Sequence, residues 1–126
     1  MIIGIGIDAV EIERCAAFAS YSHTRLMRLF SPEEIAYCLQ EPTKSAERFA
    51  ARFATKEALY KALTQARGKP PAPFFTLCKY TMVQLNPSPT LIIDLKQLNM
   101  PSYKVLTSIT HTKNNALAQV IIQEEL

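Results

Sequence analysis

Glu57 and Lys61 are the two residues whose types and spacing most directly suggest chemistry. They lie four residues apart in the stretch RFATKEALYKAL (residues 52–63), which is rich in helix-forming residues and contains no Gly or Pro. On a helix, this spacing puts both side chains on one face, one turn apart. Such a carboxylate and ammonium can bind a divalent cation and a phosphate side by side. The same spacing also forms a common helix-stabilising ion pair worth only about 0.2–0.5 kcal/mol, so spacing alone leaves both interpretations open.

Asp8 is a second candidate carboxylate. It follows the run Ile2–Ile7, in which Ile alternates with Gly. This pattern predicts a short buried strand whose glycines let another backbone approach closely. Asp8 would be held rigidly at the end of that strand, or would serve as the N-cap of a following helix. The run has neither the third glycine of a dinucleotide-binding fingerprint nor the Gly-Lys-Ser/Thr of a P-loop.

His111 and three arginines are further candidates, each with a plainer alternative. His111 lies in TSITHTK (residues 107–113), where hydroxyl groups and a lysine suit phosphate oxygens. A single His at a strand end is also a common surface residue that only forms hydrogen bonds. Arg14, Arg25 and Arg28 put positive charge on or just after the first helix, either as a solvated face or as a docking surface for an acidic protein.

The first half of the chain predicts the helices that must position these residues. We expect a helix over Val10–Phe18, and another that begins at Ser31 with Pro and two acids in its first turn and ends before Pro42. The longest helix is expected over Thr43–Ala66. Gly68 and two following prolines end it.

After residue 70 the helical periodicity disappears and residues that favour strands take over. The expected strands are Leu77–Leu85, Thr90–Leu95, Tyr103–Thr110 and Ala116–Gln123. The segment NPSP (residues 86–89) predicts a hairpin connection, and KNN (residues 113–115) predicts a turn between the last two strands. Helices followed by strands indicate an α+β fold with an antiparallel sheet and a long central helix. We expect residues 1–126 to form one domain.

Composition restricts the class of protein. Apolar residues make up 48% of the 126 residues, and the net charge of +3 is too small for a nucleic-acid-binding protein. No run approaches the ~20 apolar residues of a membrane span, and the N-terminus lacks the basic region of a signal peptide. Three widely spaced cysteines suggest reduced thiols rather than disulfides or a zinc site. We therefore expect a cytoplasmic protein that binds neither nucleic acid nor membranes.

Four segments together resemble the holo-acyl-carrier-protein synthases, the small bacterial phosphopantetheinyl transferases. They are IGIGIDAVEIER (3–14), FSPEEIAY (30–37), RFATKEALYKAL (52–63) and SITHTKNNALAQV (108–120), in the order and spacing of that family. The resemblance covers about the first 66 and the last twenty residues. It implies transfer of 4′-phosphopantetheine from coenzyme A to a serine of apo-acyl carrier protein, with release of adenosine 3′,5′-bisphosphate. Between Gly68 and Met100 the chain lacks the glycine-rich turn and Gly-Lys-Pro hairpin usual in related sequences, which leaves the wall facing the pantetheine undefined.

The resemblance also implies roles for individual residues. Asp8 and Glu57 would be ligands of Mg²⁺, and Lys61 would contact the coenzyme A phosphates. These three would be the catalytic residues, with Glu57 or a metal-held water as the hypothetical proton acceptor. The residues implied near the adenosine 3′-phosphate are Lys44, Arg52, His111 and Thr112. The residues implied to face the acidic helix of the carrier protein are Arg14, Arg25 and Arg28.

Helix geometry adds an expectation about assembly. At 100° per residue, Arg52 and Glu57 are about 140° apart around the helix, so one ligand can hardly reach both within one subunit. If both contact coenzyme A, the site lies between subunits, in agreement with the homotrimer that the resemblance implies. Two other functions stay open at this point. One is transfer to a different carrier domain, and the other is a non-catalytic module that binds a carrier protein.

Overall fold

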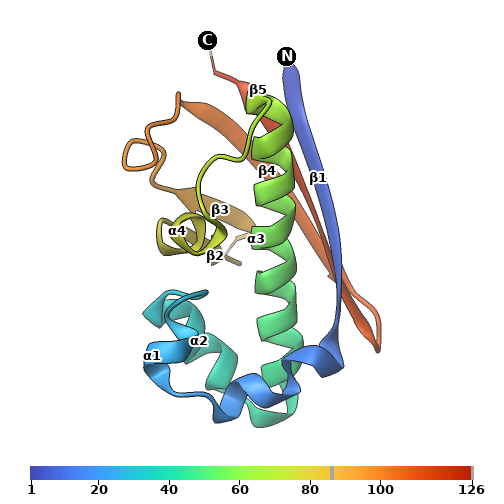
Figure 1. Cartoon of the computed structure of the whole chain (residues 1–126). Helices are drawn as coiled ribbons and strands as arrows, with labels where there is room; N and C mark the ends of the chain where they lie inside the picture. Colours follow the sequence, from blue (N-terminus) through green and yellow to red (C-terminus); the bar gives the residue numbers. More distant parts are fainter. Residues whose placement is uncertain (86, 126) are drawn as a thin grey trace.

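One long helix lies across a three-stranded antiparallel sheet in the computed structural model, which describes residues 1–85 and 87–125 (Figure 1). The helix is α3 (Ser45–Arg67), and the sheet has the order β1 (Ile2–Glu11), β5 (Asn115–Glu124), β4 (Tyr103–His111). Alanines of α3 and the inward side chains of β5 are buried between the two layers. The predicted α+β class, antiparallel sheet and long central helix are confirmed.

The ends of α3 follow the sequence signals closely. A short 3₁₀ turn, η2 (Pro42–Lys44), leads into the helix, so the α-helix itself begins two residues later than predicted. Gly68 ends it in the left-handed conformation, with φ of 73°, and its N–H donates to the Thr64 carbonyl. A residue without a Cβ adopts that conformation without strain, which is why the predicted stop is confirmed.

The first strand is buried on one face only. β1 is an edge strand, and its isoleucines point outward, with Ile5 49% and Ile7 61% exposed. Its glycines face α3 instead, and a Cβ added at Gly6 would lie 2.0 Å from the carbonyl oxygen of Ala58. The expected close backbone approach is therefore confirmed, whereas the strand is buried only on its glycine face, with Ile3 partly covered.

The predicted helix over Val10–Phe18 is confirmed only in part, because its type and its first residue differ. β1 continues to Glu11 because Val10 and Glu11 pair with β5, and the ladder of hydrogen bonds extends the strand past Asp8. A 3₁₀ helix, η1 (Ile12–Ser20), follows. Asp8 consequently lies inside a strand and is not a helix N-cap.

Two short helices precede α3. They are α1 (His23–Leu26) and α2 (Pro32–Leu39). The start of α2 is confirmed as a capping box, because the Ser31 side chain accepts from the Glu34 N–H and the Glu34 carboxylate accepts from the Ser31 N–H.

The segment after Gly68 departs most from the prediction. Helical structure does not end there, since α4 (Phe74–Lys79) precedes the strand and buries Leu77 and Cys78 in the core. The strand β2 covers only Thr81–Gln84 and pairs with β3 (Thr90–Ile93) as a separate two-stranded sheet. This pairing confirms the hairpin, although Asn86 of its connection lies outside the described residues. The turn between β4 and β5 is confirmed, with the Thr112 N–H donating to the Asn115 carbonyl at 2.8 Å. No helix in the two described ranges is both long and apolar enough to cross a membrane.

Candidate active site

Asp8, Glu57 and Lys61 come together where β1 crosses α3. The Lys61 ammonium donates to Asp8 Oδ1 and to the Ile7 carbonyl, both at 3.0 Å. Lys61 therefore forms its ion pair with Asp8, and in the described part of the chain no ion pair joins it to Glu57. The glycine face of β1 makes this contact possible because it brings the strand backbone directly onto the helix.

Glu57 lies in an environment that disfavours its charge. Burial raises the pKa of its carboxyl group above the usual value, and the neighbouring Asp8 carboxylate raises it further. Lys61 and Arg14 oppose this shift with smaller effects. Two carboxylates that repel each other beside one exposed lysine form a local site that a bound cation would stabilise.

The donor set fits magnesium better than a metal that needs a complete protein cage. Within residues 1–85 and 87–125, no three His, Cys, Asp or Glu side chains gather as a metal-binding group. Mg²⁺ binds through one or two carboxylates, keeps several waters and takes phosphate oxygens at its other positions. Asp8 and Glu57 are therefore sufficient protein ligands for this ion.

An aromatic wall flanks Glu57. Phe53 and Tyr60 lie on the same face of α3 as Glu57, and the ring of Phe74 from α4 packs edge-on against both, with centroids 6.0 and 5.9 Å apart. Phe74 was given no role from the sequence, because it lies before the expected strand Leu77–Leu85, in the segment where the chain departs from the family pattern. The paired Phe74 and Phe75 directly after Pro73 were the available signal for an apolar surface.

The three candidate docking arginines do not all face the same way. Arg14 lies on η1 and is close enough to Glu57 to lower its pKa. Arg25 stacks on the Tyr21 ring at 3.6 Å. With Arg28 it lines a hollow of about 280 Å³ whose other walls are apolar and include the exposed Phe75.

A second cluster surrounds Arg52 on another side of α3. Lys44, Arg52 and His111 line one cavity of about 540 Å³ together with Tyr37 and Arg48, so the structure brings three of the predicted nucleotide residues together. Arg48 and Arg52 both stack on the Tyr37 ring, at 4.0 and 4.5 Å. Tyr37 and Arg48 were not predicted as site residues. No pattern in the sequence shows that they lie beside His111 of β4.

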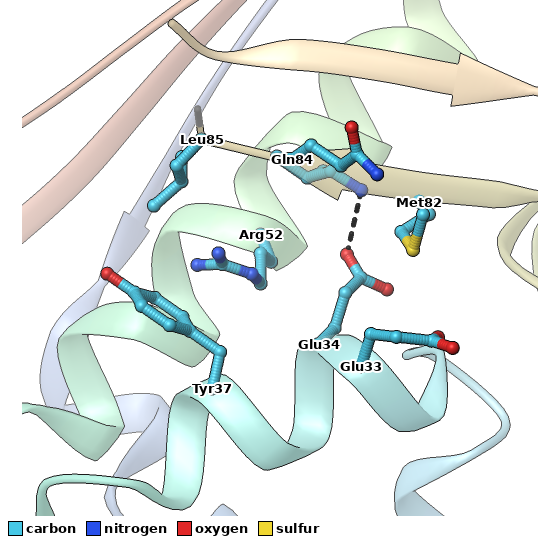
Figure 2. A pocket seen from close by; sticks show the side chains of 8 residues that line it. Glu33, Glu34, Tyr37, Arg52, Met82, Gln84 and Leu85 are labelled. Carbon is cyan, nitrogen blue, oxygen red and sulfur yellow. Dashed lines mark hydrogen bonds between the residues drawn. The ribbon is translucent and has the colours of Figure 1, made fainter. Parts of the chain in front are cut away.

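Arg52 is buried, and among the residues that the structure describes no carboxylate pairs with it. Only 4% of it is exposed, its Nε has no hydrogen-bond partner, and one terminal nitrogen donates to the Arg48 carbonyl at 3.3 Å. Figure 2 shows its guanidinium extending between Tyr37 and Leu85, at the edge of a cavity of about 390 Å³ between α2 and β2. A buried cation with free donors is a natural ligand for an anion.

His111 and Thr112 have partners that the sequence did not predict. His111 Nε2 lies 2.6 Å from Glu47 Oε1, so this carboxylate holds the imidazole at the end of β4. The Thr112 hydroxyl accepts from the Asn115 N–H at 3.1 Å. His111 and Thr112 line a neighbouring cavity of about 400 Å³, and Thr112 does not line the cavity of Arg52.

Comparison with known proteins agrees with this arrangement. Residues 4–119 match the family described as ACPS: 4'-phosphopantetheinyl transferase superfamily. The chain belongs to this superfamily. A holo-[acyl-carrier-protein] synthase of Koribacter versatilis is 35% identical over 130 residues, which cover 98% of this chain and 100% of the relative.

Solved structures of the same kind of enzyme share the fold. A holo-(acyl-carrier-protein) synthase from Bacillus anthracis in complex with CoA (3',5'-ADP) is 27% identical, with 99% of each chain covered and a TM-score of 0.77. The Chronobacterium ammoniagenes ACPS-CoA complex is 25% identical, with 98% of each chain covered and a TM-score of 0.81. The match therefore extends through the segment after Gly68 in which the sequence pattern departs from the family.

Proposed function

We propose that this chain is a phosphopantetheinyl transferase that moves 4′-phosphopantetheine from coenzyme A to a serine of apo-acyl carrier protein. The reaction releases adenosine 3′,5′-bisphosphate and activates the carrier for fatty acid synthesis. The observation that supports this most is the cluster of Asp8, Glu57 and Lys61 at the crossing of β1 and α3, in a chain of this superfamily. We also propose that the protein acts in the cytoplasm, as predicted from its sequence.

The carboxylate pair gives the reaction its metal site. Asp8 and Glu57 would hold Mg²⁺, and the bound ion would neutralise charge on the pyrophosphate as the bisphosphate leaves. Lys61, which is about half exposed and paired only with β1, is positioned to add a second positive charge to the phosphates.

Proton transfer is assigned to Glu57. The serine oxygen attacks the phosphorus that carries pantetheine, the bond from that phosphorus to the leaving bisphosphate breaks, and the serine proton passes to the carboxylate. In the metal-free protein, burial and the Asp8 carboxylate raise the pKa of Glu57, so the group binds a proton more strongly than an exposed glutamate does. Asp8, on the other side of the same site, stays a metal ligand.

The nucleotide end is assigned to the second cluster. Arg52 has free guanidinium donors and is buried beside a cavity, so it would bind the adenosine 3′-phosphate. Lys44 and His111 line the same cavity and would add charge and hydrogen bonds, with Thr112 beside them.

A homotrimer with shared sites is also part of the proposal. The carboxylate cluster and Arg52 lie on different sides of α3, as helix geometry predicted, so one coenzyme A would bind residues of two subunits. The outer face of the sheet supports self-association, since Ile5, Ile7 and Leu106 are exposed there and β5 brings Ile121 between them. Sedimentation equilibrium on active protein tests this, and an active monomer would rule out the shared site.

The carrier is expected to dock on the face that includes Arg25 and Arg28. Positive charge around an apolar hollow suits an acidic amphipathic helix, and Arg14 is close enough to Glu57 to lower the pKa of that carboxyl group. Docking there would bring the carrier serine toward Glu57.

Intact mass spectrometry tests the activity. Apo-acyl carrier protein is incubated with the protein, coenzyme A and Mg²⁺, beside an EDTA sample and a sample with Glu57→Gln. We expect one added phosphopantetheine in the first sample only. Transfer that persists in EDTA would remove the metal from the proposal, and transfer by the variant at a normal rate would remove Glu57.

A further inference from the structure

A fully buried ion pair lies beside the Arg52 cavity and has no part in the proposed transfer. Lys56 Nζ is 2.7 Å from Glu34 Oε1, and only 1% of each side chain is exposed. Lys56 also donates to the Leu29 carbonyl at 2.6 Å. The Glu34 oxygens accept two further bonds, from the Ser31 N–H at 2.9 Å and from the Val83 N–H at 3.0 Å. The pair thus connects α2, α3 and β2.

Stability alone is a weak reason for such a pair. The cost of removing two charges from water often equals or exceeds their attraction, and a well-packed apolar pair is frequently as stable. Lys56 is the residue before Glu57, yet it projects about 100° away from it around the helix, toward α2. Lys56 therefore lies on the side of α3 that carries Arg52, and not on the side that carries Glu57.

Two buried cations, Arg52 and Lys56, lie on this side of α3 near one buried carboxylate, that of Glu34. Arg52 and Lys56 are one helical turn apart on the same face of α3, and they are 4% and 1% exposed. Glu34 lines the same cavity as Arg52, and Figure 2 shows its carboxylate directed toward β2 rather than toward the guanidinium. Arginine is normally the preferred partner of a carboxylate, because its planar fork matches both oxygens. Here the carboxylate is taken by Lys56 and by backbone N–H groups, and Arg52 keeps free donors.

We infer that Lys56 is a positioning residue for nucleotide binding: by pairing with Glu34 it keeps Arg52 free for the anion of the ligand. Without Lys56, the buried Glu34 carboxylate keeps only its bonds from two backbone N–H groups and has lost its cation, and Arg52 is a cation that lines the same cavity. The guanidinium then turns to Glu34, and the site loses both its charge and its donors. This inference depends on the proposed contact between Arg52 and the adenosine 3′-phosphate.

The test compares coenzyme A with 3′-dephospho-coenzyme A as substrates. The measured quantity is the ratio of the two kcat/KM values, which reports recognition of the 3′-phosphate. Lys56→Met should lower this ratio about ten- to a hundredfold, the value of a charged hydrogen-bonded contact, mainly through the KM for coenzyme A. The double variant Lys56→Met/Glu34→Gln should restore the ratio, because no carboxylate is left to attract Arg52. A purely structural role for the pair predicts that Lys56→Met lowers kcat/KM for both substrates by the same factor, so the ratio stays at the wild-type value.

Arg52→Met separates this inference from the nucleotide assignment on which it depends. If Arg52→Met leaves the ratio unchanged, the proposed 3′-phosphate contact is wrong, and the inference with it. If Arg52→Met lowers the ratio but Lys56→Met does not, only the inference is overturned. Should Lys56→Met fail to fold, Glu34→Gln and the double variant decide, since both must keep the wild-type ratio and a reduced ratio in either refutes the role of Lys56.

Discussion

Gly6→Ala should push apart the two elements that carry the active-site carboxylates. Gly6 is buried against α3, two residues before Asp8. A Cβ at this position would lie 2.0 Å from the Ala58 carbonyl oxygen and 2.8 Å from the Ala62 nitrogen. Both are backbone atoms, so no side chain can rotate away. To reach an ordinary separation of 3.4 Å, β1 must move from α3 by about 1.4 Å.

Two effects follow from a movement of this size. Overpacking of a core by one methyl group costs about 1–3 kcal/mol, and a backbone clash belongs at the upper end of that range. Asp8 moves with the strand, so its 3.0 Å bond to Lys61 is lost. Mg²⁺ requires ligands near 2.0–2.1 Å, and a misplacement of about 1 Å can reduce catalysis roughly 10²-fold.

Urea unfolding and Mg²⁺-dependent transfer measure the two effects. We expect Gly6→Ala to lower the free energy of unfolding by about 3 kcal/mol and kcat/KM by roughly a hundredfold, with weaker Mg²⁺ activation. Gly68→Ala is the matched control. Its Cβ meets no atom within 4 Å but has a φ of +73°, so it should cost only about 1 kcal/mol and leave activity intact. A Gly6→Ala protein with wild-type stability and activity would refute the argument that glycine permits the close approach.

Three other predictions concern charge. Burial and Asp8 raise the pKa of Glu57, so ionised Glu57 destabilises the metal-free fold as pH rises above the usual carboxyl value. Glu57→Gln should therefore raise the Tm of metal-free protein at pH 7 and leave it unchanged near pH 4, and a lower Tm at pH 7 would contradict this. Burial raises the pKa of Cys15 to about 11 and of Cys38 and Cys78 to about 12. A thiol reagent at pH 8 should therefore label the three thiols only in urea, and rapid labelling of the native protein would argue against buried thiols. Because burial disfavours the thiolate, the free energy of unfolding should fall as pH rises from 9 toward 11. Arg28→Glu should raise the KM for the carrier at least about tenfold at low salt and leave the KM for coenzyme A unchanged; equal effects on both would place docking elsewhere.

The sequence predicted those parts of the fold that depend on local signals. Helix-forming residues and Gly68 define α3, and the capping box at Ser31 defines the start of α2. The alternation in Ile2–Ile7 predicted a strand but could not tell which face is buried. That choice depends on Ala58 and Ala62 of α3, which accept only glycines opposite them. The helix α4 was missed because residues 77–79 were assigned to the expected strand Leu77–Leu85, and the burial of Leu77 and Cys78 is a tertiary contact that local sequence does not reveal.

The candidate site was predictable to a similar extent. The resemblance implied that Asp8, Glu57 and Lys61 belong to one site, and the structure brings the three side chains together where β1 meets α3. Their catalytic role stays a prediction. The aromatic residues beside the two clusters were not predictable. Tyr37, in the cavity of Arg52, and Phe74, beside Glu57, both reach α3 from other segments of the chain. The pair of Lys56 with Glu34 was missed for the same reason, since a single lysine in a helix gives no sign that it is buried.

The pairing of β1 with β5 determines when, during synthesis of the chain, the proposed catalytic cluster gains its supporting sheet. Within the described residues β1 has one sheet neighbour, and Ile5 pairs with Ile121 across almost the whole length of the sequence. During synthesis, Asp8 leaves the ribosome early, but its strand has no partner until residues 115–124 have emerged. Contacts of such large sequence separation form late in folding. A nascent chain therefore carries both carboxylates before β1 has a sheet partner, and the sheet that supports the proposed catalytic cluster is complete only once β5 has been made.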